Sequence, residues 1–433
     1  MVQKIVKIFE ELKERIKDEK GNREKYVNDI VSFTRQRKLT IEILVMFLLN
    51  MPKKTMTVEL EKYFEILGMA SCTKGSYSQR RKLLSHKIFI DMNEKYCNSI
   101  YEKLDCKRWK GKKVIAVDGT KLNLFNKKEV VAEFGVQKTK GKDVPMAHVI
   151  SSYDVLNNIC IKSEITGLNR GEGIVALKRV PSYSHDTVVL YDRGFPSFGL
   201  IFQQIENKIP FVMRLKKDFN KETIKFANGK AKEKIVEIGI SARGRRVLKE
   251  EGYEVNKDTK IKVRLIRIEL RNDFTIIATS LKNRKKYKRE DFKKLYNLRW
   301  GIETYYDKLK NKMKAETFSG RTVENIKQEF YALILFSNIH SLIVKATESE
   351  TAKTKDVNKK EQKINQNVTI GLLKDKIVEL LISPTIIDVL LLMIKKFSRY
   401  KIPIIPDRQN KRKAKGYIIR GKHKTILNYC SSI

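Results

Sequence analysis

The chain has 433 residues and a formal net charge of +41, from 91 Lys and Arg against 50 Asp and Glu. A chain of this length can bury a large core and is expected to hold more than one domain, which excludes a small scaffold. Solubility does not require so large a basic excess, so the charge predicts a polyanionic partner, with nucleic acid favoured over a membrane surface.

Neither a membrane span nor a zinc site is expected. The sequence has no uncharged apolar run of about 18 residues or more. The cysteines at 72, 97, 106, 160 and 430 show no C-x-x-C spacing, and no pair of histidines stands near them. Reduced thiols in a cytosolic setting are therefore expected.

The first part of the chain, to about Leu104, has the apolar periodicity of helices and almost no strand signal. A loop at 70–75 is expected to lead into a basic helix. A helical DNA-binding region fits this pattern, and a region that only packs against the rest fits nearly as well, because no recognition helix can be identified.

The pattern changes at Gly111, where short β-rich segments begin. The order up to residue 217 is three strands, a helix, a strand, a helix and a strand, as in an α/β domain. Strands are predicted at 112–119, 147–158, 158–167, 186–194 and 210–217, and helices at 172–180 and 197–208.

Further along, strands alternate with Gly- and Lys-rich turns from about 218 to 281. Helices then return, first in a segment around Glu303 and then in a long buried helix at 324–346. A polar segment with little means to pack follows, and after it come one or two helices at 372–397 and a basic tail. The 372–397 segment is either the core of a C-terminal region or a dimer interface.

The segment "YNLRWGIETYYDKLK", residues 296–310, predicts an amphipathic helix with two different faces. At about 100° per residue, one arc carries a single acid with basic and aromatic neighbours: Tyr296, Arg299, Glu303 and Lys310. The roughly opposite arc is apolar and suited to packing on a sheet: Leu295, Leu298, Ile302, Tyr305 and Leu309. A surface ion pair would explain Arg299 and Glu303 alone. A carboxylate among cations and a hydroxyl is suited to a metal ion and the phosphates around it.

Two aspartates stand at the ends of predicted strands, Asp118 in "VIAVDGT" and Asp192 in "VVLYDRG". Each alone is typical of a turn or a helix cap. If the first and fourth strands are parallel neighbours, the two carboxylates lie side by side, and the helix would direct Glu303 to the same place. Three carboxylates repel one another unless divalent cations neutralise them, and two ions roughly 3.5 to 4 Å apart form a clamp for phosphoryl transfer. The sequence therefore predicts metal ligation by Asp118, Asp192 and Glu303.

These residues resemble a known family. The three acids, with Y-x2-R-x3-E-x6-K from Tyr296 to Lys310, are similar to the insertion-sequence DDE transposases that carry the Tyr-Arg-Glu-Lys signature. The similarity extends over most of the chain through the segments "RKLT", "DGTKLNL", "YDRGF", "FVMRLK", "RWGIETYYDKLK", "ETFSG" and "QEFYALILFSN".

The resemblance implies a DNA transposase that cleaves the terminal inverted repeats of its own insertion sequence and joins the ends to target DNA. It implies catalysis by Asp118, Asp192 and Glu303 with two Mg²⁺ ions, or Mn²⁺, and without a covalent intermediate. The implied partner is double-stranded DNA, bound by a homodimer. The implied setting is the bacterial cytoplasm at the nucleoid, with no membrane.

The implied fold is α/β, an RNase H-like catalytic domain with a β-rich insertion, flanked by helical N- and C-terminal regions. The long gap between Asp192 and Glu303 leaves room for the insertion. The expected regions are a helical N-terminal DNA-binding region at 1–105, the catalytic domain at 106–217 and 286–345, the insertion at 218–285, a polar linker at 346–368, and a helical C-terminal region with a basic tail at 369–433.

Four residues are expected to bind DNA beside the cleavage site. Arg299 and Lys310 would hold phosphates, the Arg with a planar fork and the Lys as a point charge. Tyr296 would add a hydroxyl hydrogen bond to the same backbone. Trp300 would stack on an unstacked base, although a core tryptophan under the insertion explains it about as well.

Two other classes of function fit parts of the sequence. A stand-alone metal-dependent nuclease, such as a junction resolvase, could use the same fold and metals, but it would not need the phosphate-binding stripe, the insertion or the basic flanks. An inactive transposase-derived DNA-binding protein would keep the basic charge, and the presence of all three acids argues against it.

Overall fold

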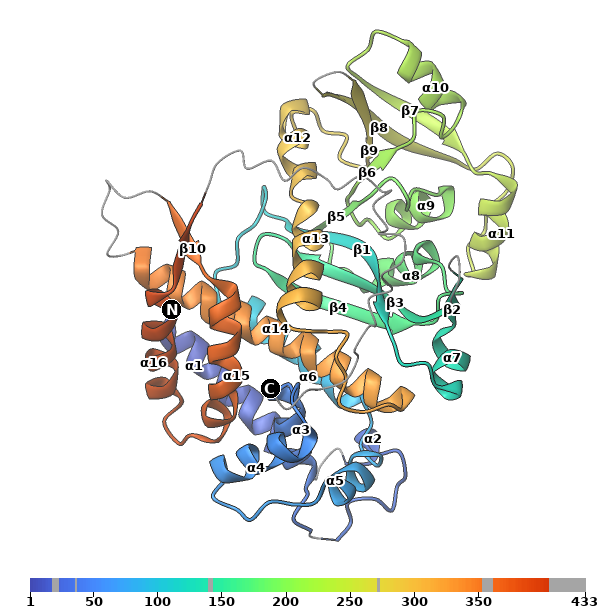
Figure 1. The fold of residues 1–433 in the computed structure, drawn as a ribbon. Helices are drawn as coiled ribbons and strands as arrows, with labels where there is room; N and C mark the ends of the chain where they lie inside the picture. Colours follow the sequence, from blue (N-terminus) through green and yellow to red (C-terminus); the bar gives the residue numbers. More distant parts are fainter. Residues whose placement is uncertain (18–22, 36, 139–142, 271–272, 353–360, 405–433) are drawn as a thin grey trace, which may run out of the picture.

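The computed structural model describes residues 1–17, 23–35, 37–138, 143–270, 273–352 and 361–404. A mixed β-sheet runs through the molecule, and helices cover both of its faces (Figure 1). The N-terminal helices (blue) and the C-terminal helices (red) lie on the same side of the sheet, together with the long helix α14 (Val323–Ala352, orange). Both ends of the chain therefore contribute to one core.

The described part of the sheet has nine strands in the order β2-β3-β1-β5-β6-β9-β8-β7, with β4 also paired to β3. The strands are β1 (Lys113–Asn123), β2 (Val136–Gln137), β3 (Val144–Asp154), β4 (Ile159–Thr166), β5 (Thr187–Tyr191), β6 (Phe211–Leu215), β7 (Glu233–Gly239), β8 (Lys260–Glu269) and β9 (Phe274–Thr279). The antiparallel strands β4, β3 and β1 are followed by β5 and β6, parallel to β1. This is the RNase H-like arrangement that the sequence predicts.

The two central strands are apolar on both faces, as strands covered by helices on both sides must be. Residues 114–117 of β1 and 188–191 of β5 are fully buried. The two strands run parallel, and Val117 pairs with Tyr191 at the end of the shared ladder. The prediction that the first and fourth strands are parallel neighbours is confirmed.

Strand β1 is longer than predicted. The sequence suggests a turn after Asp118, but the strand continues to Asn123, because β3 offers an antiparallel partner as far as Met146. The parallel pairing with β5 stops at Val117. Asp118 therefore lies level with the end of the neighbouring strand β5, although its own strand, β1, continues beyond it.

The strands of the predicted insertion at 218–285 continue the same sheet beyond β6. Strand β9 pairs antiparallel with β6, and β8 and β7 follow. Two helices that the sequence did not predict also lie here, α10 (Lys221–Asn228) and α11 (Ala242–Glu250). Helix α11 packs by the buried Leu248, with the partly buried Val247 beside it, and most of its other residues are charged.

The two predicted helices, α8 (Glu172–Arg179) and α9 (Phe198–Glu206), are present and cover one face of the sheet. They form the crossovers from β4 to β5 and from β5 to β6, with the short 3₁₀ turn Val180–Ser182 after α8. Helix α9 begins after Ser197, whose side chain accepts a hydrogen bond from Leu200 N at 3.2 Å. This N-cap fixes the point at which α9 begins.

The opposite face of the sheet shares its core with both ends of the chain. The helices there are α1 (Val2–Lys17), α2 (Arg23–Tyr26), α3 (Ile41–Leu49), α4 (Met56–Ile66), α5 (Lys74–Arg81), α6 (Lys87–Lys103), α7 (Lys128–Phe134), α14, α15 (Gln366–Ile382) and α16 (Ile386–Arg399). Among the described helices, only α14 is long and apolar enough to cross a membrane, but 94% of its apolar window is buried inside the protein. It is the central core helix.

The polar linker predicted at 346–368 begins later than expected. Helix α14 continues to Ala352, because Ala346 and Thr347 are still buried in the core. Beyond the linker, β10 (Gln362–Ile364) pairs with β11 (Lys401–Pro403). The linker residues 353–360 and most of the predicted basic tail, 405–433, lie outside the described residues.

The C-terminal segment at 372–397 forms two helices, α15 and α16. Their buried residues, such as Leu373, Leu390 and Phe397, join the same core as α14. The interpretation of this segment as part of the protein's own core is therefore confirmed. Leu391 and Leu392 remain exposed on α16, and the dimer interface stays a prediction.

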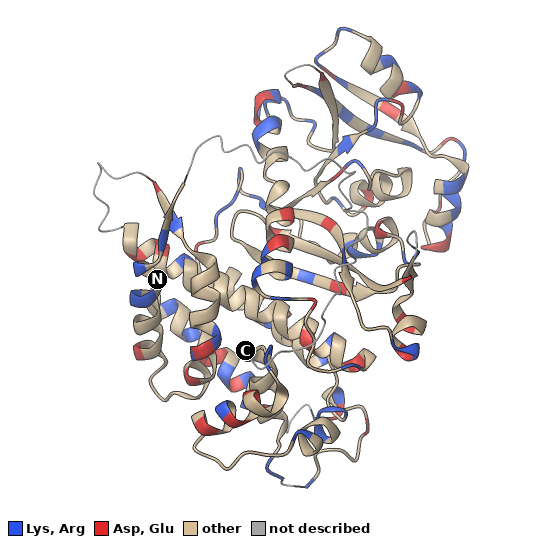
Figure 2. Ribbon diagram, in the orientation of Figure 1, with Lys and Arg blue, Asp and Glu red and all other residues tan. Residues whose placement is uncertain are grey.

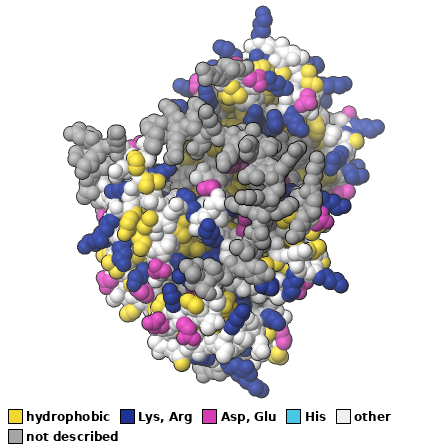
Figure 3. Space-filling view, viewed as in Figure 1, with side chains coloured by type: hydrophobic (Ala, Val, Ile, Leu, Met, Phe, Trp, Pro, Cys, Tyr) yellow, Lys and Arg dark blue, Asp and Glu magenta, His cyan; other side chains and the backbone are white. Residues whose placement is uncertain are grey.

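Basic side chains are spread over the described surface. Figure 2 shows Lys and Arg on helices of every region and along the strands of the insertion. In Figure 3 they surround the visible face of the molecule. Helix α11, for example, exposes three basic side chains: Arg243, Arg246 and Lys249. The surface thus has the charge that attracts a polyanion.

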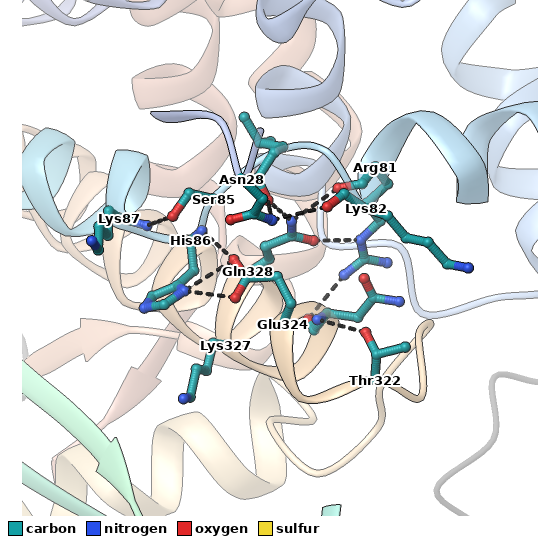
Figure 4. Close-up of polar contacts among 12 residues, drawn as sticks. Asn28, Arg81, Lys82, Ser85, His86, Lys87, Thr322, Glu324, Lys327 and Gln328 are labelled. Atoms are coloured by element: carbon teal, nitrogen blue, oxygen red, sulfur yellow. Dashed lines mark hydrogen bonds and ion pairs between the residues drawn. The ribbon is translucent and has the colours of Figure 1, made fainter. Parts of the chain in front are cut away.

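A buried polar junction fixes the N-terminal helices to the start of α14 (Figure 4). Arg81 Nε donates to Gln328 Oε1 over 2.7 Å, and Arg81 Nη2 donates to Glu329 Oε1 over 3.0 Å. Nearby, His86 N donates to Glu324 Oε1 over 2.6 Å. The Arg81 and Glu329 side chains are only 2% and 4% exposed, so neither charge can be solvated if its partner is lost.

Replacing Arg81 by methionine is expected to lower the free energy of unfolding by about 3 kcal/mol or more, because Glu329 would stay buried without its counter-ion. Urea unfolding of the Arg81→Met variant would measure the loss. The exposed neighbour Lys82, changed to methionine, provides the control. Equal stability of the two variants would contradict a structural role for the junction.

Candidate active site

The three predicted acids come from three separate elements. Asp118 lies in β1, Asp192 directly follows β5, and Glu303 lies in α13 (Trp300–Asp307). Val117 and Tyr191 are paired in the parallel ladder. Asp118 and Asp192 are the residues that directly follow this pair, so they lie side by side. Helix α13 runs across the sheet at this point, and Figure 2 shows acidic residues gathered there.

One guanidinium connects all three carboxylates. Arg299 Nη2 donates to Glu303 Oε1 at 2.7 Å, Nη1 lies 3.6 Å from Asp118 Oδ2, and Nε lies 4.0 Å from Asp192 Oδ1. The Arg299 side chain is 5% exposed, whereas those of Asp192 and Glu303 are 42% and 40% exposed. The carboxylates therefore meet around a buried cation while two of them remain open to solvent.

The segment that carries Arg299 and Glu303 is not the single regular helix that the sequence predicts. Helix α12 (Arg289–Asn297) stops before α13 begins, and a π-helical turn, Lys308–Lys312, follows α13. Gly301 permits a close approach to the sheet, since a Cβ there would lie 3.1 Å from Val155 Cγ1. Extra residues in π-turns change the direction of later side chains and often occur at functional sites.

The apolar face of this segment packs as predicted. The buried members are Leu295, Ile302, Tyr305 and Leu309, while Leu298 is half-buried. Tyr306 adds a polar anchor, because its hydroxyl donates to Asp118 O at 2.6 Å and accepts from Ser151 N at 3.1 Å. The helix that carries Glu303 is thus tied directly to the backbone of Asp118.

Of the other stripe residues, the structure brings Tyr296 to the acids but not Lys310. The Tyr296 hydroxyl donates to Asp192 Oδ1 at 3.4 Å. Lys310 Nζ donates instead to the backbone oxygen of Lys121 at 2.6 Å. Trp300 is 46% exposed, and the Arg299 guanidinium lies 5.3 Å from its ring centroid. This exposure excludes the alternative of a core tryptophan.

The surroundings of the site shift the pKa values of Asp118 and Arg299. Burial raises the pKa of Asp118 to about 6, and the charges of Glu172 and Glu303 add to the rise. Burial alone would lower the pKa of Arg299, but the hydrogen bond to Glu303 and the charge of Asp192 raise it. Arg299 therefore stays charged, and near pH 7 it neutralises only part of the negative charge around it.

Sequence reasoning missed a fourth carboxylate, Glu172, at the start of α8. It lies directly over Gly119, where a Cβ would stand 2.1 Å from Glu172 Oε1. His148 Nε2 lies 2.8 Å from the same oxygen. An acid in the first turn of a helix is ordinary and carries no functional signal in the sequence. Only the crossing of α8 over β1 places it next to Asp118.

The donor set of Asp118, Asp192 and Glu303 suits a divalent cation, because carboxylate oxygens are preferred ligands of Mg²⁺ and Mn²⁺. Within the described ranges, no three His, Cys, Asp or Glu side chains stand close enough together to hold an ion. The three carboxylates are instead paired with the Arg299 guanidinium. Ligation requires them to turn from Arg299 toward the ion.

Two further acids hold the loops around the site. Glu316 Oε1 accepts from Asn123 N at 3.0 Å and from Asn123 Nδ2 at 2.9 Å, which fastens the end of β1. Glu329 accepts from Ser319 N at 2.9 Å and from Gly320 N at 3.1 Å. These contacts bind the segments "DGTKLNL", "ETFSG" and "QEFYALILFSN" into one framework.

A comparison with family models identifies the class of protein. The model described as the transposase DDE domain matches residues 109–339, which include the sheet, the insertion and all three acids. The chain belongs to the DDE transposase family, as the acids and their signature predict.

A comparison with solved structures also finds similar chains. The chain is similar to a piggyBac transposase in a cryo-EM structure of its synaptic complex with hairpin DNA, with 11% sequence identity and a TM-score of 0.42. The similarity covers 88% of this chain and 82% of that chain. No curated protein matches the chain.

The π-helical turn next to the site buries a lysine. Lys308 Nζ donates to Ser341 Oγ at 3.2 Å and to Ser337 O at 3.4 Å, and in the described part of the chain it forms no ion pair. It lines a cavity of about 60 Å³ together with His340. Burial lowers the pKa of Lys308 to about 7, and the charge of Lys312 adds to this.

Lys308→Met is expected to remove a pH-dependent stability term. Below pH 7 Lys308 is charged in both states, and its buried charge destabilises the fold. Between pH 7 and about 10.4 only the unfolded state keeps the proton, so wild-type stability rises with pH. In urea unfolding, the free energy of unfolding of wild type should rise by about 2 to 3 kcal/mol relative to that of Lys308→Met from pH 6 to pH 9. A constant difference, like that of the exposed Lys294→Met control, would contradict the expectation.

Proposed function

We propose that this protein is the transposase of an insertion sequence, which cleaves the terminal inverted repeats of its own element and joins them to target DNA. The observation that carries this proposal is the convergence of Asp118, Asp192 and Glu303 on Arg299 at the edge of two parallel strands. Membership of the DDE transposase family and the basic surface support it.

Asp118, Asp192 and Glu303 would hold divalent cations, Mg²⁺ or Mn²⁺, with two ions at the scissile phosphate. When bound, such ions activate water or a DNA 3′-hydroxyl and stabilise the leaving oxygen in an in-line displacement. The chain's own contribution is to position the ligands. Asp118 is fixed by the ladder and by Tyr306, and Glu303 by the buried face of α13.

The residues beside the acids would hold the DNA backbone. Arg299 offers a planar fork for a phosphate once it turns from the carboxylates. Tyr296 lies next to Asp192 and can give its hydroxyl to the same strand. Trp300 presents an exposed ring for an unstacked base. Lys310 would contact phosphates farther along, near Lys121 on β1.

Double-stranded DNA is the partner in this proposal, because a formal charge of +41 favours a polyanion and the family acts on DNA. Binding two element ends calls for two active sites, so we propose a homodimer on DNA. The protein would act at the nucleoid of a bacterial cytoplasm. The exposed Arg243, Arg246 and Lys249 of α11 are suited to sequence-independent phosphate contacts.

The catalytic assignment is tested with Mg²⁺ and labelled DNA that carries the inverted repeats flanking the gene. Glu303→Gln is expected to reduce cleavage by at least about 100-fold, because a lost charged ligand removes several kcal/mol of transition-state stabilisation. Asp307→Asn, an exposed acid one turn later on α13, is the control and should cleave as wild type does.

Equal cleavage by wild type and Glu303→Gln would overturn the assignment. Cutting of branched DNA irrespective of end sequence, without strand joining, would favour the stand-alone nuclease. Specific binding of the repeats by wild type, with no cleavage under any metal, would favour the inactive DNA-binding protein.

A further inference from the structure

The three site carboxylates share one counter-ion. Asp118, Asp192 and Glu303 each form an ion pair with Arg299, and within the described residues no other Lys or Arg pairs with any of them. The guanidinium can serve all three because its five N–H donors fan out in one plane. Arg299 therefore occupies the position where the negative charge of the site is neutralised.

Arg299 is held there mainly by charge attraction and only in part by hydrogen bonds. Only one of its three contacts, to Glu303 at 2.7 Å, is a hydrogen bond, while the contacts to Asp118 and Asp192 are 3.6 and 4.0 Å long. Its Nε is buried and has no hydrogen-bond partner. A guanidinium with unused donors gains when a phosphate offers bidentate hydrogen bonds.

We propose that Arg299 is the internal counter-ion of the metal-free site and that DNA must draw it away before divalent cations can bind tightly. This inference rests on the proposed function. A divalent cation and the guanidinium compete for the same carboxylate oxygens, and the three acids cannot converge on an ion while they surround Arg299.

This competition for the carboxylates couples the binding of DNA to the binding of divalent cations. A DNA phosphate that binds Arg299 frees the carboxylates, and an ion that binds the carboxylates frees Arg299 for the phosphate. By linkage each ligand then raises the affinity for the other by the same factor. Arg299 thereby becomes a positioning residue that delays metal loading until a DNA end is in place.

The test measures Mn²⁺ binding to the full-length protein by electron paramagnetic resonance, with and without duplex DNA carrying an element end. Wild type should bind Mn²⁺ weakly alone and about tenfold or more tightly with DNA. Arg299→Ala should bind Mn²⁺ without DNA about tenfold or more tightly than wild type, and DNA should add little. Arg299→Lys keeps the charge and should remain as weak as wild type without DNA.

Arg193→Ala is the matched control, because Arg193 follows Asp192, is exposed and forms no ion pair among the described residues. It removes the same charge nearby without touching the carboxylates, so its Mn²⁺ affinity should equal that of wild type. If Arg193→Ala tightened Mn²⁺ binding as much as Arg299→Ala, net charge would explain the effect and the proposal would fall. It would also fall if Arg299→Ala bound Mn²⁺ no more tightly than wild type.

A further variant separates this inference from the proposed function. Asp192→Asn should abolish the DNA-dependent Mn²⁺ binding, because it removes a ligand without removing Arg299. If Asp192→Asn bound Mn²⁺ as wild type does, the carboxylates would not be the metal site and the proposed function itself would fail. If Asp192→Asn lost Mn²⁺ while Arg299→Ala matched wild type, only the counter-ion role would be wrong.

Discussion

Mutual repulsion among three carboxylates is the constraint on which the rest of the structure depends. Asp118, Asp192 and Glu303 are brought together by strand pairing and helix packing, and their charges oppose that arrangement. Arg299 offsets the repulsion from within the site, at a position that is shielded from solvent. In the proposed function, the same cation that offsets this repulsion would hold a DNA phosphate.

The surrounding fold keeps the acids in place against this repulsion. The buried parallel ladder between β1 and β5 sets the spacing of the aspartates, and the Tyr306 hydroxyl holds α13 on the backbone of Asp118. Glu316 and Glu329 fasten the loops that follow. Because α14 shares its core with helices from both ends of the chain, damage far from the acids would be transmitted to the site through packing.

Much of the catalytic region could be predicted, since its signals are local. Apolar runs marked the central strands, and the turn of the chain after Tyr191 marked Asp192. The buried face of α13 followed from helical spacing. Prediction failed where tertiary partners decide. Strand β3 prolongs β1 past Asp118, core burial prolongs α14 to Ala352, and the short, basic α11 packs by only Leu248 and Val247.

The sequence by itself determined which residues could do the chemistry: three acids, the Tyr-Arg-Glu-Lys spacing and a large basic excess. Residue type and local periodicity carry that information because they need no partner. Only the tertiary structure decided that Arg299 stands among the acids, that Lys310 points to β1 and that Glu172 lies over Gly119. These are distances between segments far apart in the chain, and strand register, helix crossing and a π-turn set them.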